Sequence, residues 1–119
     1  MRARIEALAR EQGIAAAFVV CGIGSLSCAA IRFAGAARPE FHEGNLEIVS
    51  LAGTVSPDGA HLHASLADAS GRVFGGHVAI GCRVRTTAEI LLAELPGWTF
   101  SRLHDAATGY RELVIERPA

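Results

Sequence analysis

Three histidines stand close together near the middle of the sequence: His61, His63 and His77. Imidazole nitrogen is a preferred ligand of zinc and of other divalent transition metals, and three histidines with one open position are a common zinc arrangement. His61 and His63 are two residues apart, the repeat at which side chains share one face of a β-strand. A metal site therefore requires a second strand that brings His77 to the same face.

The segment between these histidines predicts a β-hairpin. The Ala-Ser-Gly tripeptide at 69–71 suits a three-residue turn, because the last position of that turn favours glycine in the left-handed conformation, and Gly71 occupies it. In this register His63 lies directly across from His77, and His61 lies diagonal to His77 on the same face. The hairpin thus predicts a cluster of three imidazoles.

Alternation along the two expected strands, 61–67 and 72–84, supports that register. The even-numbered apolar positions are expected in the core: Leu62, Ala64, Leu66, Phe74, Val78 and Ile80. The histidines occupy odd positions and face away from the core. A solvent-facing polar surface, or histidines that hydrogen-bond across a subunit interface, would show the same pattern, so spacing alone leaves these alternatives to a metal site open.

Two glycines and two glutamates are further candidates for the site. Gly75 and Gly76 precede His77, and backbone without side chains lets a ligand or a neighbouring chain approach closely. Glu43 and Glu47 flank the start of another expected strand, where a carboxylate can coordinate a metal, orient a ligand or act as a base. Ordinary exposed glutamates would look the same in the sequence.

The remaining patterns predict an α+β domain with a mainly antiparallel sheet packed with one or two helices. We expect a single domain over 1–119. Its expected elements are a helix at 1–12, strands at 14–21, 26–33, 46–55, 61–67, 72–84, 86–95 and 110–115, a turn or bulge at 22–25 and a loop at 34–44. At 86–95 strand is preferred to helix because Pro96-Gly97 ends the segment abruptly, and 100–105 is ambiguous.

Composition narrows the function classes. Half of the 119 residues are hydrophobic, which indicates a folded domain and favours burial between subunits of a homo-oligomer. The net charge is −1 and lysine is absent, which argues against a protein that neutralises many nucleic-acid phosphates.

The cysteines and the apolar runs bear on location. The three cysteines lie in apolar runs without metal-site spacing, so we expect each to be buried and reduced, as in the cytoplasm. No apolar run approaches the roughly 18 residues of a membrane span, and no secretory signal is recognisable. These features predict a cytoplasmic protein without a membrane partner.

Five blocks between about residue 5 and residue 95 carry a resemblance to a known family. They are Gly-Ser-Leu-Ser at 24–27, Glu-Gly-Asn-Leu-Glu-Ile-Val-Ser-Leu-Ala-Gly-Thr at 43–54, His-Leu-His-Ala-Ser-Leu-Ala-Asp at 61–68, Gly-Arg-Val-Phe-Gly-Gly-His at 71–77 and Thr-Ala-Glu at 87–89. In this order they resemble the PPC domain, also called DUF296 or the PD1-like DNA-binding domain.

The resemblance implies an α+β fold that assembles as a homotrimer. Plant members of the family are nuclear proteins with AT-hooks, whereas prokaryotic members stand alone and carry a DNA-binding label. In some prokaryotic members, histidines at positions matching His61, His63 and His77 look like a zinc site. This chain has no AT-hook, and it begins at the helix where relatives usually have a preceding strand, so one sheet edge is expected to differ.

Three functions follow as hypotheses. The first is a non-enzymatic, homotrimeric module that binds zinc or another divalent transition metal, together with a small-molecule or protein partner. The second is a DNA-binding protein with a regulatory role, which rests on the family label. The third is a metal-dependent, hydrolase-like enzyme in which the metal activates water and Glu47 acts as the base.

Overall fold

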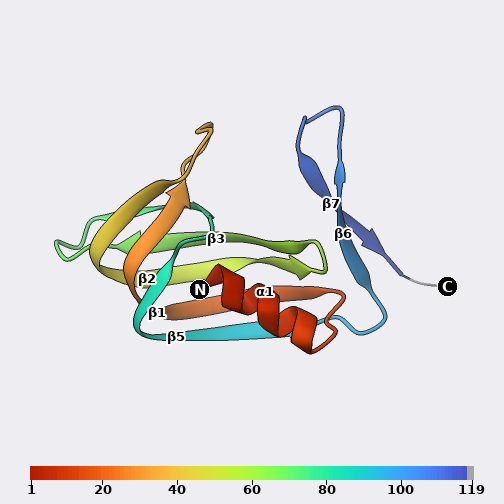
Figure 1. Ribbon diagram of the computed structural model, residues 1–119, viewed down its shortest axis with the longest axis horizontal. Coiled ribbons are helices and arrows are strands. Elements are labelled where there is room, and N and C mark those ends of the chain that lie inside the picture. The colour runs from red at the N-terminus through yellow and green to blue at the C-terminus, as the bar shows by residue number, and fades with distance from the viewer. Residues whose placement is uncertain (118–119) are drawn as a thin grey trace.

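The computed structural model describes residues 1–117 and contains one helix and seven strands in that range. In chain order these are α1 (Arg2–Glu11), β1 (Ala17–Arg32), β2 (Glu40–Ser56), β3 (Gly59–Ala67), β4 (Val73–Val78), β5 (Arg83–Glu94), β6 (Thr99–His104) and β7 (Arg111–Glu116) (Figure 1). The predicted α+β class with an antiparallel sheet is confirmed. No helix within 1–117 is long and apolar enough to cross a membrane.

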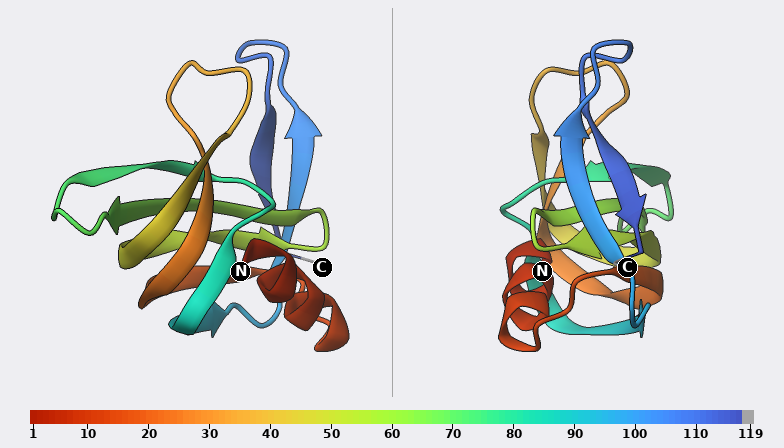
Figure 2. Two further views of the ribbon diagram at one scale, coloured as in Figure 1. Left: turned by 60° about the vertical axis from the view of Figure 1, so that its left-hand side comes forward. Right: turned by 90° about the vertical axis from the view of Figure 1, so that its right-hand side faces the viewer.

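The main sheet closes on itself around β1. Its strand order is β2-β3-β4-β1-β5, and β1 also pairs with β2, so β1, β2, β3 and β4 form a ring. One edge of β1 pairs with β2, and the other edge pairs first with β5 and then, at Ile31 and Arg32, with β4. The long strands curve strongly to make this closure (Figure 2), and the register of β1 shifts at bulges, which increase local twist and bending.

The core lies inside this ring. Its largest fully buried aliphatic side chains come from four different strands: Leu26, Ile31, Leu51, Leu62, Leu66, Val19, Val55 and Val78. Helix α1 adds Ile5 and Ala9, which are buried with them. The even-numbered positions of β3 therefore face the core as predicted, and the odd-numbered histidines face away from it.

Of the two alternatives predicted at 22–25, the structure shows no turn, whereas a bulge agrees with the shift in the β1–β5 register between Gly24 and Leu26. The chain continues through Gly22-Ile23-Gly24-Ser25 as one strand that pairs with β2 on one side and with β5 on the other. At Gly24 a Cβ atom would overlap the carbonyl oxygen of Thr87 and lie 2.7 Å from Cα of Ala88. Glycine is needed there because two backbones approach closely, and not because the chain reverses.

The structure also differs from the sequence-based predictions in some strand boundaries and in the burial of two residues. The expected loop at 34–44 is shorter, because β2 already begins at Glu40, which pairs with Ile31. The expected strand 72–84 is interrupted, since β4 ends at Val78 and β5 begins at Arg83. Ile80 consequently lies outside the ladder and is 55% exposed instead of buried. Cys21 is exposed, whereas the other two cysteines are buried as expected.

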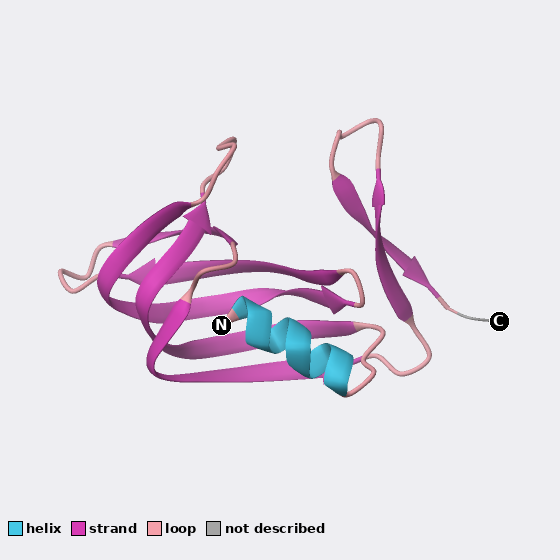
Figure 3. Cartoon of the chain, in the orientation of Figure 1, coloured by secondary structure: helices cyan, strands magenta, loops and turns pink. Residues whose placement is uncertain are grey.

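The last two strands form a separate hairpin beside the ring (Figure 3). The ambiguous segment 100–105 falls mainly in β6, and the predicted strand at 110–115 corresponds to β7. Phe100 fastens the hairpin by packing edge-on against Phe18, with ring centroids 5.5 Å apart. The backbone N–H of Arg102 also donates to the Asp58 carboxylate at the β2–β3 turn, at 2.7 Å.

Candidate metal centre

The β3–β4 hairpin positions the three histidines through short-range contacts. Gly71 has a φ of 81°, the left-handed conformation that the turn requires. The Asp68 backbone N–H donates to the Arg72 carbonyl at 2.9 Å, which sets the pairing of the two strands. His63 lies opposite His77 in the resulting ladder. The predicted register is therefore confirmed.

The three rings form one compact cluster. One ligand nitrogen from each of His61, His63 and His77 lies within 4.8 Å of the other two. The Nε2 atoms of His61 and His63 are 3.2 Å apart. Tetrahedral zinc with N–Zn bonds of about 2.0–2.1 Å requires nitrogen pairs about 3.3 Å apart, which follows from the tetrahedral angle. The donor set thus fits a divalent metal, and the His61–His63 nitrogen pair already has the spacing that tetrahedral zinc requires.

Burial favours the neutral form of two rings in this cluster, His61 and His77. Burial, followed by the charges of His61 and Arg32, lowers the pKa of His77 from 6.5 to about 4. Burial also lowers the pKa of His61, and the nearby charge of Arg102 adds to that effect. A metal ligand must be the neutral imidazole with a free lone pair. These two rings are therefore available to a metal without first losing a proton at neutral pH.

The same shifts predict acid sensitivity of the metal-free protein. Because the folded-state pKa of His77 lies below 6.5, the folded state takes up fewer protons than the unfolded state between 6.5 and about 4. The free energy of unfolding should therefore fall as the pH drops from 6.5 to about 4. Urea unfolding of metal-free protein at about pH 7 and about pH 5 measures the loss, and His77→Asn should reduce it. Equal pH dependence in parent and variant would contradict the assignment.

Gly75 and Gly76 serve strand packing. A Cβ atom on Gly75 would overlap the carbonyl oxygen of Ala64, and one on Gly76 would lie 2.7 Å from the carbonyl oxygen of Arg32. Strand β4 runs between β3 and β1, and the two glycines let it approach both backbones. They therefore help to place His77.

The two glutamates lie apart from the histidines. The Glu43 carboxylate forms an ion pair with Arg83 at 3.2 Å, at the far end of β2. Glu47 pairs in register with Ala67, the last residue of β3, whereas His63 pairs with Ala52. Neither carboxylate belongs to the group of potential metal ligands. The structure therefore does not bring Glu43 or Glu47 to the cluster.

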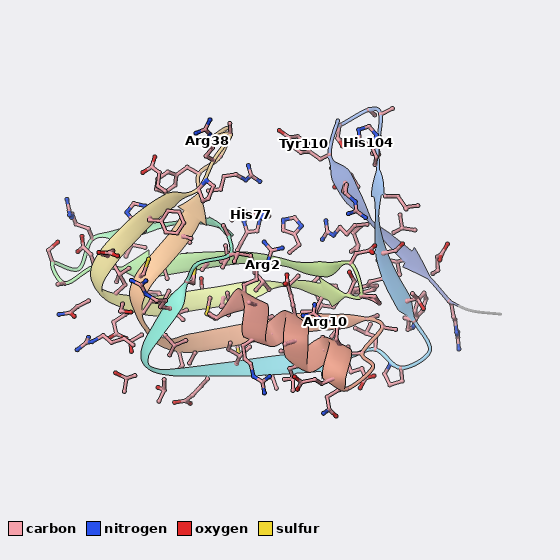
Figure 4. All side chains as sticks on the ribbon, viewed as in Figure 1. Arg2, Arg10, Arg38, His77, His104 and Tyr110 are labelled. Carbon is pink, nitrogen blue, oxygen red and sulfur yellow. The ribbon has the colours of Figure 1, made fainter. Side chains whose placement is uncertain are left out.

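Sequence reasoning missed the arginine-rich cleft beside the histidines. A cavity of about 410 Å³ is lined by His61, His77 and a set of charged residues: Arg2, Arg32, Arg102, Arg111, Asp58 and Glu112. In Figure 4, Arg2 and His77 lie on the side of the sheet that faces the β6–β7 hairpin, from which Tyr110 extends. These residues come from both ends of the chain, so no local pattern marks them as neighbours.

The ring-shaped sheet and the histidine cluster define this chain as a small α+β domain with a candidate metal centre. The model of the Plants and Prokaryotes Conserved (PCC) domain matches residues 1–96. The chain belongs to this family, which is the PPC family that the sequence resembles. The β6–β7 hairpin lies beyond the matched range.

Two curated relatives from Synechococcus strains are named "Bifunctional protein GlmU". One is 47% identical to this chain over 116 residues, which are 98% of this chain but 18% of that protein. The other is 46% identical over 119 residues, which are 100% of this chain and 19% of that protein. The chain thus spans about a fifth of the length of these relatives.

Solved structures share the fold. A hypothetical protein from Salmonella enterica is 38% identical with a TM-score of 0.94, covering 98% of this chain and 85% of that one. A "Metal-containing Protein" from Archaeoglobus fulgidus is 29% identical with a TM-score of 0.77, covering 96% and 84%. A "Putative DNA-binding protein" from Ralstonia eutropha is 26% identical with a TM-score of 0.81, covering 94% and 81%.

Proposed function

We propose that this chain is a non-enzymatic metal-binding module that holds zinc, or another divalent transition metal, through His61, His63 and His77. The observation that carries the proposal is the convergence of three imidazole nitrogens within 4.8 Å of one another. The metal-containing relative from Archaeoglobus fulgidus supports it. Bound zinc would supply a Lewis acid that attracts an oxygen or nitrogen of a partner molecule.

Metal analysis of protein purified without a histidine tag tests this function. After dialysis against zinc and removal of free metal, the parent protein should retain about one zinc ion per chain. Zinc should also raise the unfolding free energy, by about 2.7 kcal/mol when free zinc is about 100-fold above its dissociation constant. Absence of retained zinc, together with an unchanged melting temperature, would rule out the metal function.

We propose further that residues 1–119 form one domain, which also occurs as a part of longer proteins. The relatives from Synechococcus support this, since nearly the whole chain matches a fifth of their length. A cytoplasmic location remains a prediction, supported by the three cysteines, all of them free.

Assembly as a homotrimer is also part of the proposal. The outer side of β1 and β5 carries exposed Val20, Ile23 and Leu91, which would be covered in an assembly. We expect light scattering during size-exclusion chromatography to give the mass of three chains. Ile23 is 56% exposed, so Ile23→Asp should reduce this mass without unfolding the chain, while Val73→Asp at the β3–β4 turn should not. A parent protein that runs as a monomer would contradict the trimer.

DNA binding is the second candidate, supported by the name of the relative from Ralstonia eutropha. A gel-shift titration across salt tests it, because phosphate contacts make affinity fall as salt rises. No shift at low salt would exclude it. The hydrolase-like alternative gains no support from the geometry, because Glu47, the base that it requires, pairs with the far end of β3.

A further inference from the structure

Positive charge is concentrated in the cleft beside the histidine cluster. Four guanidinium groups, from Arg2, Arg32, Arg102 and Arg111, share its wall with two carboxylates, from Asp58 and Glu112. This is an excess of two positive charges before any metal binds, in a chain whose net charge is −1. A bound divalent metal would add two more positive charges to the same space.

Two of these arginines lie next to individual histidines. Arg32 is the register partner of His77 across the β1–β4 pair. Arg102 donates to the Thr54 hydroxyl at 2.8 Å, and Thr54 is the register partner of His61. Both arginines therefore lie beside the histidine cluster.

These same two arginines carry positive charge without a carboxylate partner. Among residues 1–117, no ion pair is formed by Arg32 or by Arg102. In contrast, Arg2 pairs with Glu6 at 2.8 Å, and Arg111 lies 3.7 Å from Asp58. A planar guanidinium that is held in place by a backbone carbonyl or a hydroxyl, with further N–H groups left over, is suited to bind an oxyanion.

The cleft has the dimensions of a small-molecule site. Its volume of about 410 Å³ falls in the usual range of roughly 300–1,000 Å³ for ligand pockets. The β6–β7 hairpin forms one wall, with Tyr110 on it, and the histidine face of β3 and β4 forms another. The carboxylates of Asp58 and Glu112 also line this space.

We propose that this cleft binds a small molecule through an oxyanion, a phosphate or a carboxylate, held by Arg32 and Arg102 beside the histidine cluster. The inference rests on the proposed metal function, because the anion would lie against the histidines that hold the metal. It adds the chemical class of the ligand and assigns a role to the β6–β7 hairpin, which supplies Arg102.

Calorimetric titration of zinc-loaded protein with inorganic phosphate, and separately with malonate, tests the inference. At least one of the two anions should bind the parent, and Arg32→Gln should weaken that binding by about 10-fold or more, the loss expected for a charged hydrogen bond. Arg32→Lys should recover part of the affinity, since it retains the charge. Arg85→Gln is the matched control, because Arg85 is an exposed arginine outside the cleft.

Zinc content measured on the same samples separates the two proposals. If zinc is retained by all variants and Arg32→Gln binds both anions as well as the parent does, the anion site is refuted while the metal function stands. If no variant retains zinc, the metal function fails, and with it the inference. Binding of duplex DNA by the parent without binding of phosphate or malonate would also overturn the inference in favour of a nucleic-acid surface.

Discussion

Replacing His77 by alanine is expected to lower the affinity for zinc by about 100-fold or more, since even hydrogen-bond partners of metal ligands contribute about 10- to 100-fold. The substitution removes one of three nitrogens that converge within 4.8 Å. His61 and His63 would remain adjacent on β3, with Nε2 atoms 3.2 Å apart, but two imidazoles hold zinc much more weakly than three. Competition with a fluorescent zinc chelator measures the change.

His104→Ala is the matched control for this experiment. It removes the same side chain from the exposed end of β6, outside the group of potential metal ligands. We expect this variant to bind zinc as the parent does, and both variants to retain the parent's circular dichroism spectrum. Equal zinc affinity of His77→Ala and His104→Ala would show that the metal is held elsewhere or not at all.

Leu62→Ala is expected to lower the free energy of unfolding by about 2–5 kcal/mol, the usual cost of truncating a buried leucine. Leu62 lies between His61 and His63 on β3, and its side chain is fully buried in the ring of strands. The loss arises from the apolar contacts that are removed and from the cavity that remains. Urea unfolding of the metal-free protein measures it without a contribution from zinc.

Ile80→Ala tests burial at a position where the sequence pattern and the structure disagree. Alternation in the sequence places Ile80 in the core, whereas the structure leaves it 55% exposed in the turn between β4 and β5. Its truncation should therefore cost less than about 0.5 kcal/mol, as is usual for surface substitutions. Similar losses for Leu62→Ala and Ile80→Ala would mean that the turn packs against the core.

The sequence by itself determined the hairpin that carries the histidines. Gly71 requires no distant partner to adopt its left-handed conformation, and the turn that it closes sets the register of β3 against β4. Alternation then separates His63 and His77 from Leu62 and Leu66, because consecutive side chains in a strand point to opposite faces. Local conformation and a period of two were sufficient for this part of the candidate site.

Glycines that serve close backbone approach could not be distinguished from turn glycines in the same way. The sequence leaves Gly24 in either a turn or a bulge, and the structure places it within β1, where the backbone of Thr87 and Ala88 leaves no room for a side chain. Gly75 and Gly76 are predicted to let a ligand or a neighbouring chain approach, and the contact that the structure shows is that they let β4 fit between β3 and β1. The deciding contacts come from strands far away in the chain.

Only the tertiary structure decided what surrounds the histidines. Arg32 reaches His77 because the ring closes between β1 and β4, and Arg102 reaches Thr54 because the β6–β7 hairpin lies against the β2–β3 turn. Both contacts join segments that are more than forty residues apart and depend on which strand edges meet. A hairpin register is local and readable from a turn, whereas a cleft between a closed sheet and a separate hairpin exists only after both have folded together.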